Sequence, residues 1–333
     1  MPLARSMLGP GALRLLLALV VLVSHLSALN IGRPAVVLFF VISGYWVSRR
    51  WLEGGAGVMG FALARLLRIW PLFALISVLT WVGQGWLGLP RAADLAAGLL
   101  LLGSASRGDL LIGVAWSLDL ELQFYLCLPL LWLAARRLPG WQIWLLGGLA
   151  WGLGMWLMAR GAWSFLLYLP AFAAGMWLAA GKWCPGAGGA LAAAGAFVAI
   201  AAGMAIYPEM RPLLLKSPGL SPLVEQLGHL VWALLLLPLV ARVLAGPSGA
   251  RDRQLGDAAY ALYLVHSPII TLLATGLALD GLALKLAALP ATALATLIAW
   301  RCIDVPLERA RRGGEPIVIP GFAPLNWARK RPN

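Results

Sequence analysis

Two ionisable residues lie in the first apolar stretch of the chain, where burial of a charge is costly. Arg14 and His25 are eleven residues apart. In an α-helix this is three turns plus about 20°, so both lie on one face, about 16 Å apart along the axis. Ionisable residues inside an apolar helix usually face a cavity or a partner. An imidazole is neutral and basic near pH 7, which makes His25 a candidate functional residue. The alternative is structural, with Arg14 reaching the lipid headgroups and His25 hydrogen-bonded to a neighbouring helix.

Two further arginines open the third apolar stretch. Arg65 and Arg68 are three residues apart, so a helix places both on one cationic face. Guanidinium groups bind phosphate through paired hydrogen bonds, so this face suits the phosphates of a cytosolic ligand. The alternative is the ordinary basic flank on the cytoplasmic side of a membrane span.

Polar residues also lie inside two later apolar stretches. Glu121 follows Trp116 by more than one helical turn. A carboxylate at that depth would orient or pair with an imidazole, bind a polar acceptor, or hydrogen-bond a neighbouring helix. Tyr263 and His266 are neighbours on one helical face. Just beyond them, Pro268 frees backbone carbonyls that need other partners.

The composition shows which elements hold these residues. Of 333 residues, 61% are hydrophobic and 12% charged, whereas soluble domains carry about 25% charged residues. The apolar stretches are long enough to cross a bilayer core of about 30 Å. They are continuous rather than alternating, which favours helices over a barrel. We therefore predict an all-α integral membrane protein. The net charge of +13 reflects basic loops and a basic tail, so no nucleic-acid partner is expected.

We predict a bundle of about ten transmembrane helices. The expected spans are 11–29, 35–52, 66–84, 116–135, 141–158, 163–181, 187–206, 223–244, 258–279 and 282–303. The apolar segment near 94–105 is too short to cross and is predicted to be re-entrant or interfacial, forming a wall of a site. Gly148 and Gly152, four residues apart, are predicted to pack against another helix.

The distribution of basic residues predicts the orientation. Arginine and lysine are concentrated in the segments that are cytoplasmic when both termini are cytoplasmic. We expect a multi-pass protein of the inner (plasma) membrane. Residues 1–308 would form the transmembrane domain and residues 309–333, with Arg329, Lys330 and Arg331, a basic cytoplasmic tail.

Taken together, the candidate residues lie in motifs that resemble those of the acyltransferase-3 family, whose members are membrane O-acyltransferases of bacterial surface glycans. The resemblance covers about residues 10–310. Its motifs are Arg14-x10-His25, Phe39-Phe-Val-Ile-Ser-Gly-Tyr45, Arg65-x2-Arg68-Ile-x-Pro71, Trp116-Ser-Leu-x2-Glu121-x2-Phe-Tyr125, Tyr263-Leu-x-His266-x-Pro268 and the terminal Asp304-Val-Pro306-Leu-Glu308-Arg309. Two departures, Ala259 before Tyr260 and Ser24 before His25, touch no candidate catalytic atom.

On the donor side, the resemblance implies acyl-CoA, with acetyl-CoA as the default, as a substrate and no permanently bound cofactor or metal. The donor would dock from the cytoplasm with its phosphates on Arg65 and Arg68, together with Arg14.

On the acceptor side, the resemblance implies a hydroxyl of a surface polysaccharide or lipid-linked glycan, with a small-molecule natural product as the alternative. The acceptor would bind near Trp116 and Tyr263, and His25 would remove its proton as general base. Glu121 would orient His25 or bind the acceptor, and His266 would serve the acyl group or the developing oxyanion. Transfer through a covalent acyl-histidine intermediate, instead of direct attack by the acceptor, is an open alternative.

Three other functions are compatible with a polytopic protein. A proton-coupled transporter or flippase of a glycan or lipid-linked precursor would use the buried ionisable residues as a relay, but the two related halves common in transporters are not visible. A glycosyltransferase would need clustered acidic residues in an outer loop. A membrane scaffold would leave the buried ionisable residues unexplained.

Overall fold

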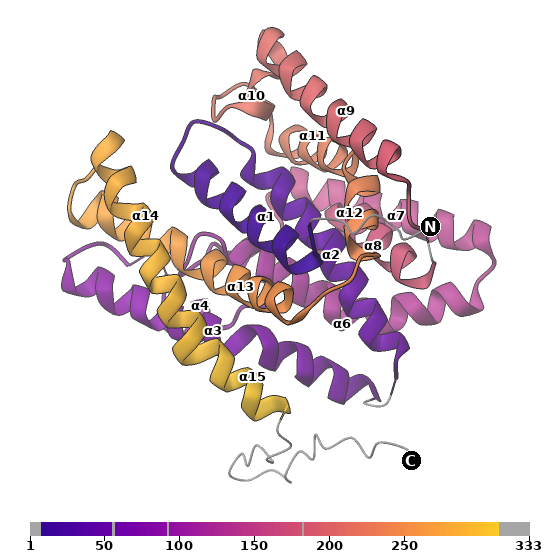
Figure 1. Cartoon of the computed structure of the whole chain (residues 1–333), viewed down its shortest axis with the longest axis horizontal. Helices are drawn as coiled ribbons and strands as arrows, with labels where there is room; N and C mark the ends of the chain where they lie inside the picture. The colour runs from indigo at the N-terminus through magenta and orange to yellow at the C-terminus, as the bar shows by residue number, and fades with distance from the viewer. Residues whose placement is uncertain (1–7, 55–56, 92, 182, 313–333) are drawn as a thin grey trace.

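The computed structural model describes residues 8–54, 57–91, 93–181 and 183–312 as a bundle of helices (Figure 1). Within these residues there is no β-strand, only a single bridge between Leu29 and Leu215. The all-α prediction is therefore confirmed. The last 21 residues of the predicted tail, 313–333, lie outside the described residues.

The helices follow one another through short connections. They are α1 (Pro10–His25), α2 (Gly32–Leu52), α3 (Gly57–Trp86), α4 (Leu95–Leu99), α5 (Ser104–Arg107), α6 (Ala115–Arg137), α7 (Gly140–Ala159), η1 (Phe165–Tyr168), α8 (Leu169–Ala180), α9 (Ala187–Ile206), η2 (Pro208–Met210), α10 (Arg211–Leu214), α11 (Pro222–Leu234), α12 (Leu237–Leu244), α13 (Ala250–Thr271), η3 (Leu272–Gly276), α14 (Gly281–Ile298), η4 (Ala299–Asp304) and α15 (Val305–Arg312). Of the short elements, η1 and η2 are 3-10 helices, whereas η3 and η4 are π-helical.

Seven of the described helices are long and apolar enough to cross a membrane, and α11 with α12 makes an eighth if this pair, bent by 52°, is one span. Two shorter apolar helices, Pro10–His25 and Phe165–Ala180, complete the set. Each of the ten predicted spans coincides with one of these segments, although the two shorter helices make the number approximate. The chain is a multi-pass membrane protein.

The segment that was predicted not to cross forms the short helices α4 and α5. The indole of Trp70, in the middle of α3, donates to the carbonyl of Leu99 (3.1 Å), so this segment folds back along α3. The buried carboxylate of Asp119 accepts from the backbone N–H groups of Gly103 (2.7 Å) and Ala105 (3.0 Å). Asp119 therefore ties the segment to α6, next to Trp116.

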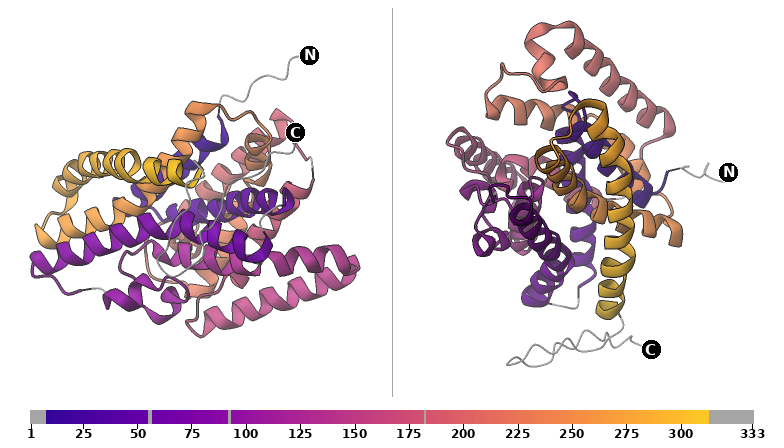
Figure 2. Two further views of the ribbon diagram at one scale, coloured as in Figure 1. Left: turned by 90° about the horizontal axis from the view of Figure 1, so that it is seen from below. Right: turned by 90° about the vertical axis from the view of Figure 1, so that its left-hand side faces the viewer.

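Helices α2 and α8 have the most extensive contact of any helix pair in the described residues, and glycine permits their close approach. A Cβ on Gly44 would meet the carbonyl of Phe172, and one on Gly175 would meet the carbonyl of Val41. The predicted packing through Gly148 and Gly152 is wrong: no described atom of another element lies within 4 Å of a Cβ built at either position. Both residues are on α7, the magenta helix at the edge of the bundle in Figure 2.

Helix α13 lies with α1 and α2 at the centre of the bundle (Figure 1). Four of its polar residues, Asp257, Tyr260, Tyr263 and His266, recur at three-residue intervals. Because three residues are less than one turn, successive side chains reach different neighbours. The first two contact α3, the third contacts α6 and the last contacts α1. Helix α13 thus connects the regions that contain the candidate site residues.

Candidate active site

A cavity of about 440 Å³ opens at the end of α1 that carries His25. We call it the outer cavity, because the loop charges predict that this end faces outward. His25, Trp116 and Tyr263, all predicted site residues, line it together with residues of the loops around α5 and α10. Ala105, Leu110, Gly113 and Val114 provide one wall, which agrees with the prediction that the segment leading to Trp116 borders a site.

His25 contacts His266 in this region. Their ring centroids are 5.1 Å apart and the ring planes meet at 66°, an edge-to-face arrangement. Nδ1 of His266 lies 3.0 Å from the carbonyl oxygen of Leu262. A carbonyl only accepts, so Nδ1 carries the proton and Nε2 carries the lone pair. Nε2 is buried and has no hydrogen-bond partner among the described residues. His25 itself makes no hydrogen bond through its ring there, which leaves its nitrogens open to a ligand.

Aromatic side chains fix the walls of the outer cavity. The hydroxyls of Tyr263 and Ser117 are 2.7 Å apart, and the ring of Tyr263 packs edge-on against Phe39 with centroids 5.8 Å apart. The indole of Trp116 lies against that of Trp163, with centroids 5.1 Å apart. The Trp163 backbone is held by Ser106, whose hydroxyl accepts from its N–H (2.8 Å) and lies 3.1 Å from its carbonyl oxygen. The predicted Trp116 thus has an aromatic partner that the sequence did not single out.

A second, smaller space of about 60 Å³ lies deeper in the bundle. Arg14 and Glu121 both line this inner cavity, and Tyr263 lines it as well as the outer cavity. The hydroxyl of Tyr125 donates to Glu121 (2.9 Å) and lies 2.6 Å from the hydroxyl of Ser43. In the described part of the chain, no hydrogen bond or ion pair joins Glu121 to His25. The structure brings Glu121 together with Arg14.

Arg65 and Arg68 differ in their surroundings. Nη1 of Arg68 donates to both carboxylate oxygens of Asp304 (2.9 and 3.2 Å), and Nη2 donates to Asp257 (3.3 Å). Glu308 adds a longer ion pair, at 3.9 Å. The buried Nε of Arg65 has no hydrogen-bond partner among the described residues. The charge of Arg68 is therefore neutralised by carboxylates, whereas no carboxylate pairs with Arg65 there.

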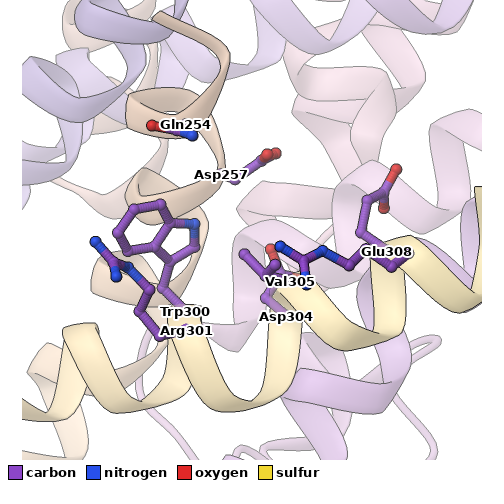
Figure 3. A pocket seen from close by; sticks show the side chains of 8 residues that line it. Gln254, Asp257, Trp300, Arg301, Asp304, Val305 and Glu308 are labelled. Atoms are coloured by element: carbon purple, nitrogen blue, oxygen red, sulfur yellow. The ribbon is translucent and has the colours of Figure 1, made fainter. Parts of the chain in front are cut away.

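A third cavity, of about 430 Å³, is lined by the three carboxylates that pair with Arg68, namely Asp257, Asp304 and Glu308 (Figure 3). Gln254 and Asp257 of α13 face Trp300, Asp304 and Glu308, which come from η4 and α15. The three cavities follow one another along α13, because Asp257 lines this one, Tyr260 the inner cavity and Tyr263 both the inner and outer cavities. In the described residues, no group of three or more His, Cys, Asp or Glu side chains is arranged to hold a metal ion.

Charged residues that the sequence did not identify as site residues line the outer cavity. They are Arg33, Lys216 and Glu225, with the amide of Asn30. Nε of Arg33 is 3.3 Å from Glu225, and the Asn30 amide donates to the same carboxylate (2.7 Å). Lys216 donates to backbone carbonyls at the end of α1, and partial burial lowers its pKa. In the sequence, no local pattern distinguishes these residues from the other charged residues of the predicted outer loops.

Comparison with known proteins identifies the family. The sequence model of the acyltransferase-3 family, described as "Acyltransferase domain", matches residues 8–303. No curated protein and no solved structure matches the chain. The matched region contains His25 and His266, the arginine pair and the buried glutamate. Because the match spans nearly the whole chain, the protein belongs to the acyltransferase-3 family of membrane acyltransferases.

Proposed function

We propose that the protein is a membrane O-acyltransferase. It moves an acyl group, acetyl by default, from cytosolic acyl-CoA to a hydroxyl of a surface polysaccharide or lipid-linked glycan, with His25 as general base. The protein lies in the inner membrane with both termini in the cytoplasm, so the donor arrives on the Arg65 side and the acceptor on the His25 side. Family membership supports the acyl transfer, and the distribution of loop charge supports the orientation.

The observation that carries this proposal is the environment of His25. Its imidazole faces a cavity large enough for part of an acceptor, and its ring nitrogens have no hydrogen-bond partner among the described residues. A general base must be within hydrogen-bond reach of the proton that it removes. A histidine with both nitrogens satisfied by protein groups would be unsuited to this role.

In the proposed reaction His25 carries one proton from the acceptor to the leaving group. A nitrogen of His25 accepts the proton of the acceptor hydroxyl as the oxygen attacks the thioester carbonyl carbon. The C–O bond forms, the C–S bond breaks, and the proton on His25 passes to the departing thiolate.

His266 and Glu121 have separate roles in this scheme. The edge-to-face contact with His266 holds the His25 ring in position, because the Nδ1–H of His266 is itself fixed on the Leu262 carbonyl. Glu121 acts on the donor side, since it shares the inner cavity with Arg14 and makes no hydrogen bond to His25 in the described structure.

The donor would approach along the cavities beside α13. Of the three arginines predicted to bind the donor, Arg65 and Arg14 have no hydrogen bond to a carboxylate among the described residues, so they are best suited to meet the donor phosphates. The inner cavity is only about 60 Å³, so passage of the thioester to His25 requires side chains that line this cavity to move.

The test is transfer of a labelled acetyl group from acetyl-CoA in membranes that contain the protein. His25→Gln keeps a polar side chain but removes the base, and transfer should fall by about 10³-fold, in the middle of the range that a general base usually contributes. His229→Gln is the matched control. His229 is buried outside the outer cavity, and its Nε2 lies 2.8 Å from the Leu213 carbonyl, a contact that Gln can reproduce. Full activity of His25→Gln would refute the role of His25.

A further inference from the structure

The outer cavity has an excess of positive charge. Of its charged residues, Arg33 and Glu225 form an ion pair with each other (3.3 Å). Lys216 has no acidic partner among the described residues, since the hydrogen bonds of its ammonium group go to carbonyl oxygens. The pair Arg33–Glu225 cancels in charge, so the cavity carries the charge of Lys216.

Lys216 is fixed at the end of the helix that carries His25. Its Nζ donates to the carbonyls of Ser24 and Ser27, the latter at 3.2 Å, and its backbone N–H donates to the carbonyl of Ala28 (2.8 Å). Carbonyls at a helix C-terminus attract cations, so these contacts alone would explain a lysine here. An ammonium group has three donors, however, and two carbonyls leave one donor free.

The relative position of Lys216 and His25 follows from helix geometry. Side chains of an α-helix lean towards its N-terminus, so the imidazole of His25 leans back into the bundle, where it meets His266. The carbonyls that Lys216 caps point the other way, out of the helix end. Lys216 and the imidazole of His25 line the same space.

We propose that the outer cavity selects an acceptor that carries an acidic group, a carboxylate or a phosphate, and that Lys216 is the residue that recognises it. This inference rests on the proposed function. The anionic group binds the free donor of Lys216, while a hydroxyl of the same molecule reaches His25 in the same cavity.

The test compares acceptors that differ in charge and share their ring hydroxyls. Methyl β-D-glucuronide carries a carboxylate, the 6-phosphate of methyl β-D-glucoside carries a phosphate, and methyl β-D-xyloside is neutral. Lys216→Gln retains a donor for the carbonyls of α1 but removes the charge, and Lys216→Arg retains the charge. The control is Lys285→Gln, which removes an exposed charge from α14 outside the cavity.

In the wild type we expect a KM about tenfold lower for at least one anionic acceptor than for the xyloside, the effect of one charged hydrogen bond. Lys216→Gln should abolish this preference and leave KM and kcat for the xyloside within about twofold. Lys216→Arg and Lys285→Gln should keep it. The anionic acceptor that shows the preference identifies the group as carboxylate or phosphate.

Two results would overturn the inference: no preference for either anion in the wild type, or an equal loss for charged and neutral acceptors in Lys216→Gln. The second result would mean that Lys216 only caps α1. If the wild type acylates none of the three acceptors, the proposed function fails for these acceptors. Recognition of the anion by Lys216 is then tested separately by ligand binding. An anionic sugar should then raise the thermal unfolding midpoint of the wild type but not of Lys216→Gln, whereas equal midpoints would refute recognition of the anion.

Discussion

Arg68 provides a sharp test of whether the arginine pair binds a ligand or holds helices together. Its guanidinium group, on α3, donates to Asp257 on α13 and to Asp304 at the end of η4. It also lies over the ring of Tyr260, 5.3 Å from the centroid. These contacts join three helices that are far apart in the sequence. We predict that Arg68→Ala lowers stability more than it weakens donor binding.

The magnitude follows from the groups left behind. Asp304 is 3% exposed, and removal of one partner from a buried ion pair costs about 3–5 kcal/mol, because the other charge loses its compensation. The Arg68 side chain is 21% exposed and the Asp257 side chain is 30% exposed. Water therefore partly replaces the lost contacts, and the cost lies at the lower end of this range. We expect a loss of about 3 kcal/mol.

The measurement is thermal unfolding of purified protein in detergent, together with KM for acetyl-CoA on the protein that remains folded. Arg65→Ala is the matched control, because Arg65 lies one turn earlier and its Nε has no hydrogen-bond partner among the described residues. Arg65→Ala should raise the donor KM with little change in the unfolding midpoint. An unchanged midpoint for Arg68→Ala with a raised donor KM would refute the structural assignment. The double variant Arg68→Ala/Asp304→Asn should recover part of the loss, because no buried charge is then left at position 304.

Two further predictions concern the scaffold. Gly175→Ala should destabilise the protein by about 1–3 kcal/mol in thermal unfolding, since the added methyl group meets the carbonyl of Val41 on α2. Gly148→Ala is the control, because a methyl group at that position lies in open space and should not destabilise the protein. Equal effects of the two substitutions would contradict the assigned packing. Asp119→Ala should leave two backbone N–H groups of the α4–α5 segment unpaired, at a cost of about 1–3 kcal/mol each. Hydrogen exchange over residues 95–107 should become faster in that variant, and unchanged exchange would show that Asp119 does not anchor the segment.

The sequence predicted the class of fold and most of the segments, because both depend on local properties. An apolar stretch either is or is not long enough to cross a bilayer, whatever lies beside it. The segment near 94–105 was predicted not to cross because it is too short and because a span there would have placed Arg136 and Arg137 on the outer side. Within α1, the spacing of Arg14 and His25 placed both on one face, and the two residues line neighbouring cavities that share Tyr263.

Only the tertiary structure decided which residues meet, because contacts between helices depend on positions that the sequence separates widely. Arg68 forms a pair with Arg65 in the sequence, but its carboxylate partners come from 189 and 236 residues away. Gly148 and Gly175 are both small residues on apolar helices, and only Gly175 has a neighbour that requires it. Lys216 lies 192 residues from the serine carbonyl that it caps at the end of α1. The sequence by itself determined that a histidine lies in an apolar helix. The fold determined that a second histidine and a lysine share its surroundings, since only packing brings distant segments to one helix end.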